Sequence, residues 1–91
     1  LLKLGVIFTN AHSSASVCAP TRYALLTGNH VYRGRNPGGT WGHFSGSQIV
    51  SNQQTIADVL RQAGYSTAFF GKSHLGSRFL RPNGIQAVGF N

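Results

Sequence analysis

The stretch from Val17 to Gly28, Val-Cys-Ala-Pro-Thr-Arg-Tyr-Ala-Leu-Leu-Thr-Gly, most constrains how this chain can fold. Pro20 suits the first turn of a helix, because it has no N–H group to leave unbonded and its φ is already helical. Gly28 suits the end of a helix, because glycine adopts the left-handed conformation without steric cost. The pattern predicts a short helix from about Pro20 to Thr27, with Cys18 at or just before its N-terminus.

Cys18 is the only cysteine of the chain. The start of the predicted helix gathers unbonded backbone N–H groups and the positive end of the helix dipole. Arg22, one turn further on, adds a guanidinium charge. One interpretation is therefore a reactive side chain in a site that favours anions. The alternative is a small buried hydrophobic residue, which is the commoner role of a lone cysteine.

The charge balance is strongly basic. The chain has 91 residues, enough for one small domain or a piece of a larger one, and its eight basic residues face a single acid, Asp58, for a net charge of +7. Such a balance favours an anionic partner, or acidic groups on chain beyond this segment. The basic residues form no dense run and do not alternate with aromatic residues, so nucleic acid is not the expected partner.

Two further function classes are excluded by composition. A single cysteine rules out an internal disulfide framework and a cysteine-rich zinc site. No stretch approaches the length of about 18 apolar residues that a membrane span requires. The hydrophobic content of 41% is that of a folded protein rather than a disordered tail.

The remaining elements point to an α/β fold. Residues 6–9 and 65–70 are rich in β-branched and aromatic residues and are predicted strands, the second one buried near its end. A helix is predicted over 55–63, with Thr55 as N-cap, Asp58 as a helix-start acid and Gly64 as the stop. Its apolar face is formed by Ile56, Val59, Leu60 and Ala63. A helix that leads into a strand followed by polar residues fits an open α/β sheet.

Four other segments are predicted to lack long regular elements. Residues 1–4 fit the tail of a helix that ends at Gly5, and residues 10–17 fit a loop leading to the cysteine. Residues 29–52 are rich in glycine, and a structureless stretch of this length is usually functional. Residues 77–91 fit a loop, with a short turn at 85–88.

Lys72 and His74 follow the second predicted strand and are the next candidate site residues. In an extended segment both side chains face the same side. With Cys18 and Arg22 they form a nucleophile precursor and three groups suited to anion binding or proton transfer. A plain Cys–His catalytic pair is also possible, but it explains neither Arg22 nor Lys72.

The other histidines and the aromatic residues carry weaker signals. His12, His30 and His43 have no metal-ligand spacing, so structural or exposed positions are expected, with His43 the best remaining candidate for substrate contact. The aromatic side chains could line a substrate rim, although packing is the default interpretation. These are Tyr23, Tyr32, Trp41 and Phe44.

The motifs together resemble those of the type I sulfatase family. Residues 18–28 resemble its first signature, Cys-x-Pro-(Ser/Thr)-Arg followed by (Leu/Ile)-Thr-Gly. Residues 64–76 resemble its second signature, Gly-Tyr-x-Thr followed by Gly-Lys-Trp-His-Leu-Gly, and residues 5–11 resemble the strand and loop that precede the first. Two separate motifs in the right order make the resemblance specific.

The resemblance implies an α/β fold, part of an alkaline-phosphatase-like sandwich with a central mixed sheet flanked by helices. It implies that a maturation enzyme oxidises Cys18 to formylglycine, whose hydrate attacks sulfur, forms a covalent sulfo-enzyme and then releases sulfate. Arg22 would hold the formylglycine, Lys72 would bind it and the sulfate group, and His74 would hydrogen-bond the diol and assist elimination.

The chain departs from the family pattern in two ways. The family binds Ca²⁺ (or Mg²⁺) through an early Asp-Asp pair and a later Asp-Asn or Asp-His/Gln pair, and neither pair is present. Cys18, as formylglycine, is the only metal ligand that the resemblance assigns to this chain, whereas hard cations need several oxygen ligands. Ser73 stands where the family usually has tryptophan.

The sequence therefore predicts that residues 1–91 are a fragment of the N-terminal catalytic domain of a sulfatase, inactive and poorly folded in isolation. A sulfate ester would be the substrate, and the location by analogy would be periplasmic, lysosomal or secreted. Two alternatives remain open. One is a phosphonate monoester or phosphodiester hydrolase of the same superfamily, and the other is a small basic module that binds polyanions.

Overall fold

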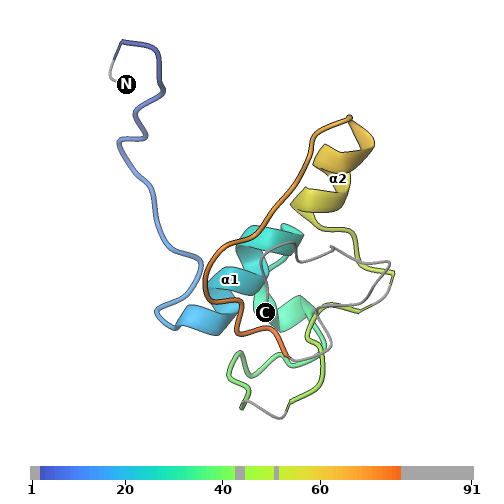
Figure 1. The fold of residues 1–91 in the computed structure, drawn as a ribbon. Helices are drawn as coiled ribbons and strands as arrows, with labels where there is room; N and C mark the ends of the chain where they lie inside the picture. The colour runs from blue at the N-terminus through green and yellow to red at the C-terminus, as the bar shows by residue number, and fades with distance from the viewer. Residues whose placement is uncertain (1–2, 43–44, 51, 77–91) are drawn as a thin grey trace.

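The computed structural model describes residues 3–42, 45–50 and 52–76. Over these ranges the chain forms helix α1 (Cys18–Thr27), a single 3₁₀ turn η1 (Val31–Arg33) and helix α2 (Ile56–Gln62). The segment before α1 extends away from the rest of the molecule, whereas the segment after α2 runs back to α1 (Figure 1). This return brings the two halves of the candidate site together.

Helix α1 confirms the first prediction, with an N-terminus slightly earlier than expected. Cys18 is its first residue, two positions before Pro20, and Val17 is an N-cap without a side-chain hydrogen bond. At the other end Gly28 has φ 70°, and its N–H donates to the carbonyl of Ala24 at 2.9 Å. A left-handed glycine here satisfies one carbonyl of the last turn, which is why the helix stops where the sequence indicates.

The loop before α1 is fastened to the helix by side-chain hydrogen bonds. The Thr21 hydroxyl donates to the carbonyl of Ala15 at 2.8 Å. The Ser13 hydroxyl lies 3.1 Å from the same Thr21 oxygen and donates to that same carbonyl at 2.8 Å. These contacts fix the direction in which the chain enters Cys18.

A small aromatic and aliphatic core lies beside α1. Its buried members are Ala19 and Tyr23 from α1, Trp41 from the glycine-rich segment and Leu75 from the segment after α2. The Tyr23 and Trp41 rings meet edge to face, with centroids 6.4 Å apart and an interplanar angle of 75°. Packing is therefore the observed role of these two aromatic residues, whereas Tyr32 is exposed.

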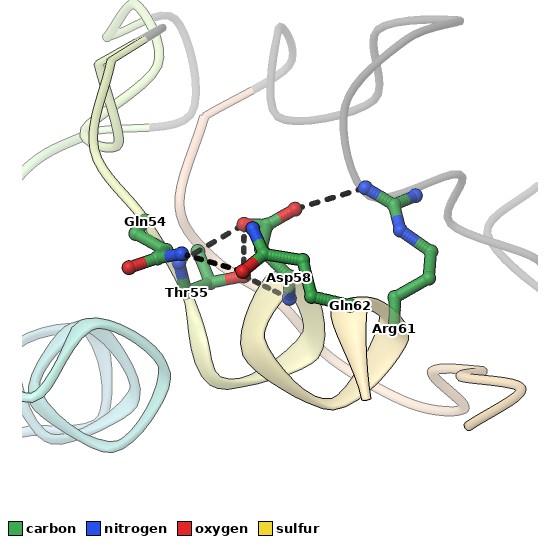
Figure 2. A network of polar contacts seen from close by, with 5 residues as sticks. All are labelled: Gln54, Thr55, Asp58, Arg61 and Gln62. Carbon is green, nitrogen blue, oxygen red and sulfur yellow. Dashed lines mark hydrogen bonds and ion pairs between the residues drawn. The ribbon is translucent and has the colours of Figure 1, made fainter. Parts of the chain in front are cut away.

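Helix α2 begins with a complete capping box, as the sequence predicts (Figure 2). The Asp58 amide donates to the Thr55 hydroxyl oxygen at 3.3 Å, and the Thr55 amide donates to the Asp58 carboxylate at 2.9 Å. Arg61 adds an ion pair to the same carboxylate at 3.0 Å. Asp58 is thus occupied as a helix-start residue, and Gly64, with φ 87°, follows the end of the helix.

Loss of this cap gives a first testable effect. In the full-length protein, Thr55→Ala should reduce hydrogen-exchange protection of the α2 amides by about fivefold, because losing an N-cap side chain costs about 1 kcal/mol. Thr40→Ala, at an exposed threonine outside any helix, is the matched control and should leave α2 unchanged. Equal exchange in both variants would show that the cap does not stabilise the helix.

The predicted strands are not formed. No strand occurs within the described ranges 3–42, 45–50 and 52–76, so neither residues 6–9 nor residues 65–70 form one there. The second segment was expected to be buried near its end, yet Phe70 is 81% exposed. A strand needs a neighbouring strand to share its backbone hydrogen bonds, and no paired strand occurs in the part of the chain that the structure describes.

The apolar face of α2 is also more exposed than its periodicity suggests. Ile56 and Val59 are each about half exposed, and α2 has no buried residue. Only Ala57, outside the predicted face, packs against the core. The helix itself is confirmed, but the surface that its apolar residues would cover is not supplied by the described residues.

A few sequence predictions lie partly or wholly outside the described residues. Residues 1 and 2 of the predicted helix tail, the predicted loop over 77–91, and His43 and Phe44 lie outside the described residues. Residues 3 and 4, the rest of the predicted helix tail, form a turn. No helix among the described residues combines the length and apolar character that crossing a membrane demands.

Candidate active site

The structure brings Lys72 and His74 to the Cys18 thiol, across more than fifty residues of sequence. His74 Nδ1 lies 3.5 Å from Cys18 Sγ, and Lys72 Nζ lies 3.9 Å from the same sulfur. Cys18 is exposed at the first position of α1, so the sulfur lies beside the uncapped, positive end of that helix. A group attached at this position would meet an ammonium, an imidazole and a helix N-terminus together.

Arg22 approaches the same cluster from one turn further along α1. Its Nη1 donates a hydrogen bond to the backbone carbonyl of Lys72. Its Nε is buried and has no partner among the described residues. The guanidinium thus links α1 to the second motif through the main chain, and one of its donors is left unused inside the site.

The backbone at His74 differs from the extended geometry that the sequence predicts. His74 has φ 52°, the single positive value for a residue other than glycine among the described residues. Both side chains still reach Cys18, but they do so through a left-handed turn rather than through simple alternation along a strand. Gly71 and Gly76, at φ 118° and 94°, lie on either side of the turn.

The cluster is cationic, and this decides what it can bind. The Lys72 ammonium lies beside the thiol and the Arg22 guanidinium contacts the Lys72 carbonyl, whereas Asp58, the only acid of the chain, is held in the α2 cap. Fixed positive charge of this kind stabilises anionic oxygens. The arrangement fits an anionic group such as a sulfuryl or phosphoryl group bound at Cys18.

The same residues do not fit a hard divalent cation. Ca²⁺ and Mg²⁺ take several oxygen ligands, largely carboxylates. No group of three or more histidine, cysteine or acidic side chains capable of holding a metal occurs in the part of the chain that the structure describes. The cluster therefore supplies groups that bind anions, and its described residues do not form a ligand set for a metal ion.

The other candidate histidines lie away from the cluster. His12 pairs with Asn10 in the exposed N-terminal segment. His30 stacks on Tyr32, with ring centroids 5.4 Å apart and planes 10° from parallel. In the described part of the chain neither imidazole is hydrogen-bonded to Cys18, Lys72 or His74, and both are exposed, in keeping with the positions expected for them.

Sequence reasoning missed two residues that contact the second motif. The Trp41 indole N–H donates to the carbonyl of His74 at 2.6 Å, and the Gln48 backbone N–H donates to the carbonyl of Leu75 at 2.9 Å. Gln48 is 5% exposed, and its side-chain carbonyl has no partner among the described residues. No spacing rule connects these positions, and the one sequence signal is a tryptophan placed among glycines.

The sequence of the chain is similar to known proteins of one family. A family model described as Sulfatase matches residues 1–84. The chain belongs to the sulfatase family. It is 36% identical to an N-acetylgalactosamine-6-O-sulfatase of Bacteroides thetaiotaomicron over 96% of its length, and 41% identical to Arylsulfatase G of Rattus norvegicus over 79%. Human Arylsulfatase G is 40% identical over the same share.

The sulfatase family has an alkaline-phosphatase-like fold and generally uses a formylglycine and a divalent metal ion. The chain spans 18% of the Bacteroides sulfatase and 14% of rat Arylsulfatase G. No solved structure matches the chain. The matched relatives are therefore several times longer than the segment that carries the Cys18 cluster.

Proposed function

We propose that this chain supplies part of the active site of a sulfuric ester hydrolase, as a segment of its N-terminal catalytic domain. The observation that carries the proposal is the convergence of His74 and Lys72 on Cys18 Sγ at 3.5 and 3.9 Å, in a chain of the sulfatase family. The family match alone would not show that the two signature motifs meet. In these contacts Lys72 and His74, from the second motif, approach Cys18, from the first.

In this proposal Cys18 is converted to formylglycine by a maturation enzyme that recognises the linear Cys18-x-Pro20-x-Arg22 motif. Cys18 is exposed at the start of α1, so its side chain can reach such an enzyme and has room for the aldehyde hydrate. The sulfur marks where the hydrate oxygens would lie. When present, the hydrate would supply an oxygen nucleophile for the sulfur atom of the ester, and the S–O bond to the alcohol would break, so that the alcohol leaves with a proton. Loss of the proton from the second hydrate hydroxyl would then release sulfate as the aldehyde re-forms, and water would restore the hydrate.

The neighbouring side chains have distinct roles in this reaction. The Lys72 ammonium binds the sulfate group and offsets the negative charge that develops on its oxygens. His74 lies within reach of a proton on the group at position 18 and assists its removal. Arg22 holds the backbone of Lys72, so that the ammonium stays beside α1.

The divalent ion of the family has no ligand set among the described residues, so no step of the reaction is assigned to it here. For a Ca²⁺ or Mg²⁺ ion, carboxylates from other parts of the protein would have to come close to Cys18. Such carboxylates would also balance the charge of +7 on this chain.

We also propose that residues 6–9 and 65–70 become strands of the central mixed sheet when the rest of the domain is present. Val6 and Phe8 are about four-fifths exposed, as is Phe70. Exposed apolar segments of this kind are costly in water and gain stability when covered.

The test is hydrolysis by the full-length protein of an aryl sulfate and of N-acetylgalactosamine 6-sulfate, chosen from the names of the matched relatives. Matched aryl phosphate and phosphonate monoesters are the comparison substrates. We expect kcat/KM to be higher for the sulfate esters. A preference for the phosphorus esters would instead assign the site to a phosphonate monoester or phosphodiester hydrolase.

A further inference from the structure

The starting point is the left-handed backbone of His74. Residues with a Cβ rarely adopt positive φ, because the side chain crowds the following carbonyl, and such a residue keeps this conformation when its surroundings impose it. His74 has φ 52° and also presents Nδ1 to Cys18. The direction of the imidazole therefore depends on whatever holds this turn.

Two hydrogen bonds from the glycine-rich segment hold the turn. Trp41 Nε1 donates to the carbonyl of His74 at 2.6 Å, and the backbone N–H of Gln48 donates to the carbonyl of Leu75 at 2.9 Å. Leu75 itself is fully buried. The carbonyls of His74 and Leu75 are thus both hydrogen-bonded, and the Leu75 side chain between them is buried in the core. These contacts restrict the backbone torsions of the turn.

The backbones of the two segments also touch. A Cβ added at Gly76 would lie 2.5 Å from the carbonyl oxygen of Gly46, closer than real Cβ atoms come to other atoms. This contact seats residues 74–76 directly against residues 46–48. Residues 46–48 therefore support the second motif.

Trp41 is in turn anchored on the helix that carries the thiol. The indole is 8% exposed and packs edge to face against Tyr23 of α1. The Tyr23 hydroxyl accepts a hydrogen bond from Gln53 Nε2 at 2.7 Å. One rigid side chain thus connects α1, which holds Cys18, to the main chain of His74.

We propose that Trp41 is a positioning residue: its indole N–H fixes the His74 backbone so that the imidazole faces the group at position 18. Trp41 acts through His74 and contacts no reacting atom. The proposal rests on the proposed function for its catalytic consequence, but the structural link between Trp41 and His74 stands on the hydrogen bond alone. The alternative is that Trp41 only fills the core.

Trp41→Phe separates these roles, because phenylalanine keeps an aromatic ring in the core but removes the N–H donor. In the full-length protein we expect kcat to fall by about 10-fold to 100-fold, the loss typical of a misplaced catalytic group, with KM changed less than about threefold. The NMR resonances of the His74 imidazole, assigned with His74→Gln, should move as well.

Tyr23→Phe is the matched control, since it removes one hydrogen bond from the same aromatic cluster without touching His74. It should lower thermal stability as Trp41→Phe does, but leave kcat and the His74 resonances near their original values. Equal changes in both variants would overturn the proposal. A tryptophan analogue with sulfur in place of the ring N–H, incorporated at position 41, repeats the test with the indole shape preserved if Trp41→Phe does not fold.

The two readouts distinguish this proposal from the proposed function. If the full-length protein hydrolyses no sulfate ester, but the His74 resonances move in Trp41→Phe and not in Tyr23→Phe, the sulfatase assignment fails and the positioning role stands. If the protein is an active sulfatase and neither kcat nor the resonances respond to loss of the indole N–H, the positioning role is refuted and the assignment stands.

Discussion

Replacing Cys18 by alanine should reduce sulfatase activity of the full-length protein by about a thousandfold or more, since removing the nucleophile of a covalent mechanism abolishes its first step. Cys18 is the only thiol of the chain. Its sulfur is also the atom that His74 Nδ1 and Lys72 Nζ both contact. Activity towards a sulfate ester, measured at saturating substrate, gives the effect.

Ser16→Ala is a matched control, because it removes one polar atom from an exposed residue two positions earlier in the chain. It should retain full activity and normal expression. The mass of the position-18 peptide from the native host provides a second readout, and it should correspond to an aldehyde in place of the thiol. An active protein that keeps the thiol and tolerates its loss would contradict the mechanism.

Local signals in the sequence predicted the helices well. Gly28 ended α1 through its left-handed conformation, and Thr55 with Asp58 capped α2. These devices act within one helical turn, so they depend little on the remainder of the protein. The proline placed the start of α1 at about Pro20, and the helix begins two residues earlier, at Cys18.

Non-local features could not be predicted in the same way. The strands at 6–9 and 65–70 have the right composition, but strand formation depends on a partner that the described residues do not supply. The bond from Trp41 to His74 joins positions 33 apart in sequence, and no periodicity links them. His74 has a left-handed φ of 52°, whereas the sequence analysis considered residues 72–74 as an extended segment, because no local signal at a histidine indicates a positive φ.

The second large effect should come from Lys72. Its Nζ lies 3.9 Å from Cys18 Sγ, and Arg22 holds its carbonyl, so the ammonium is fixed beside the position of the sulfate group. Lys72→Met removes the charge but keeps a long, flexible side chain. We expect kcat/KM for a sulfate ester to fall by about 10²-fold to 10³-fold, the usual cost of removing one group that stabilises developing charge.

Lys3→Met is the matched control, because it removes the same charge from the exposed N-terminal segment. If the effect of Lys72 came only from the net charge of the chain, both variants would lose activity equally, and the loss would disappear at high ionic strength. A local role predicts that Lys72→Met alone loses activity and that inhibition by free sulfate weakens in parallel. Because Arg22 binds the backbone rather than the ammonium of residue 72, Lys72→Arg should keep the turn in place and recover part of the lost rate. Activity as low in Lys72→Arg as in Lys72→Met would show that the shape of the lysine, and not its charge, is what the site requires.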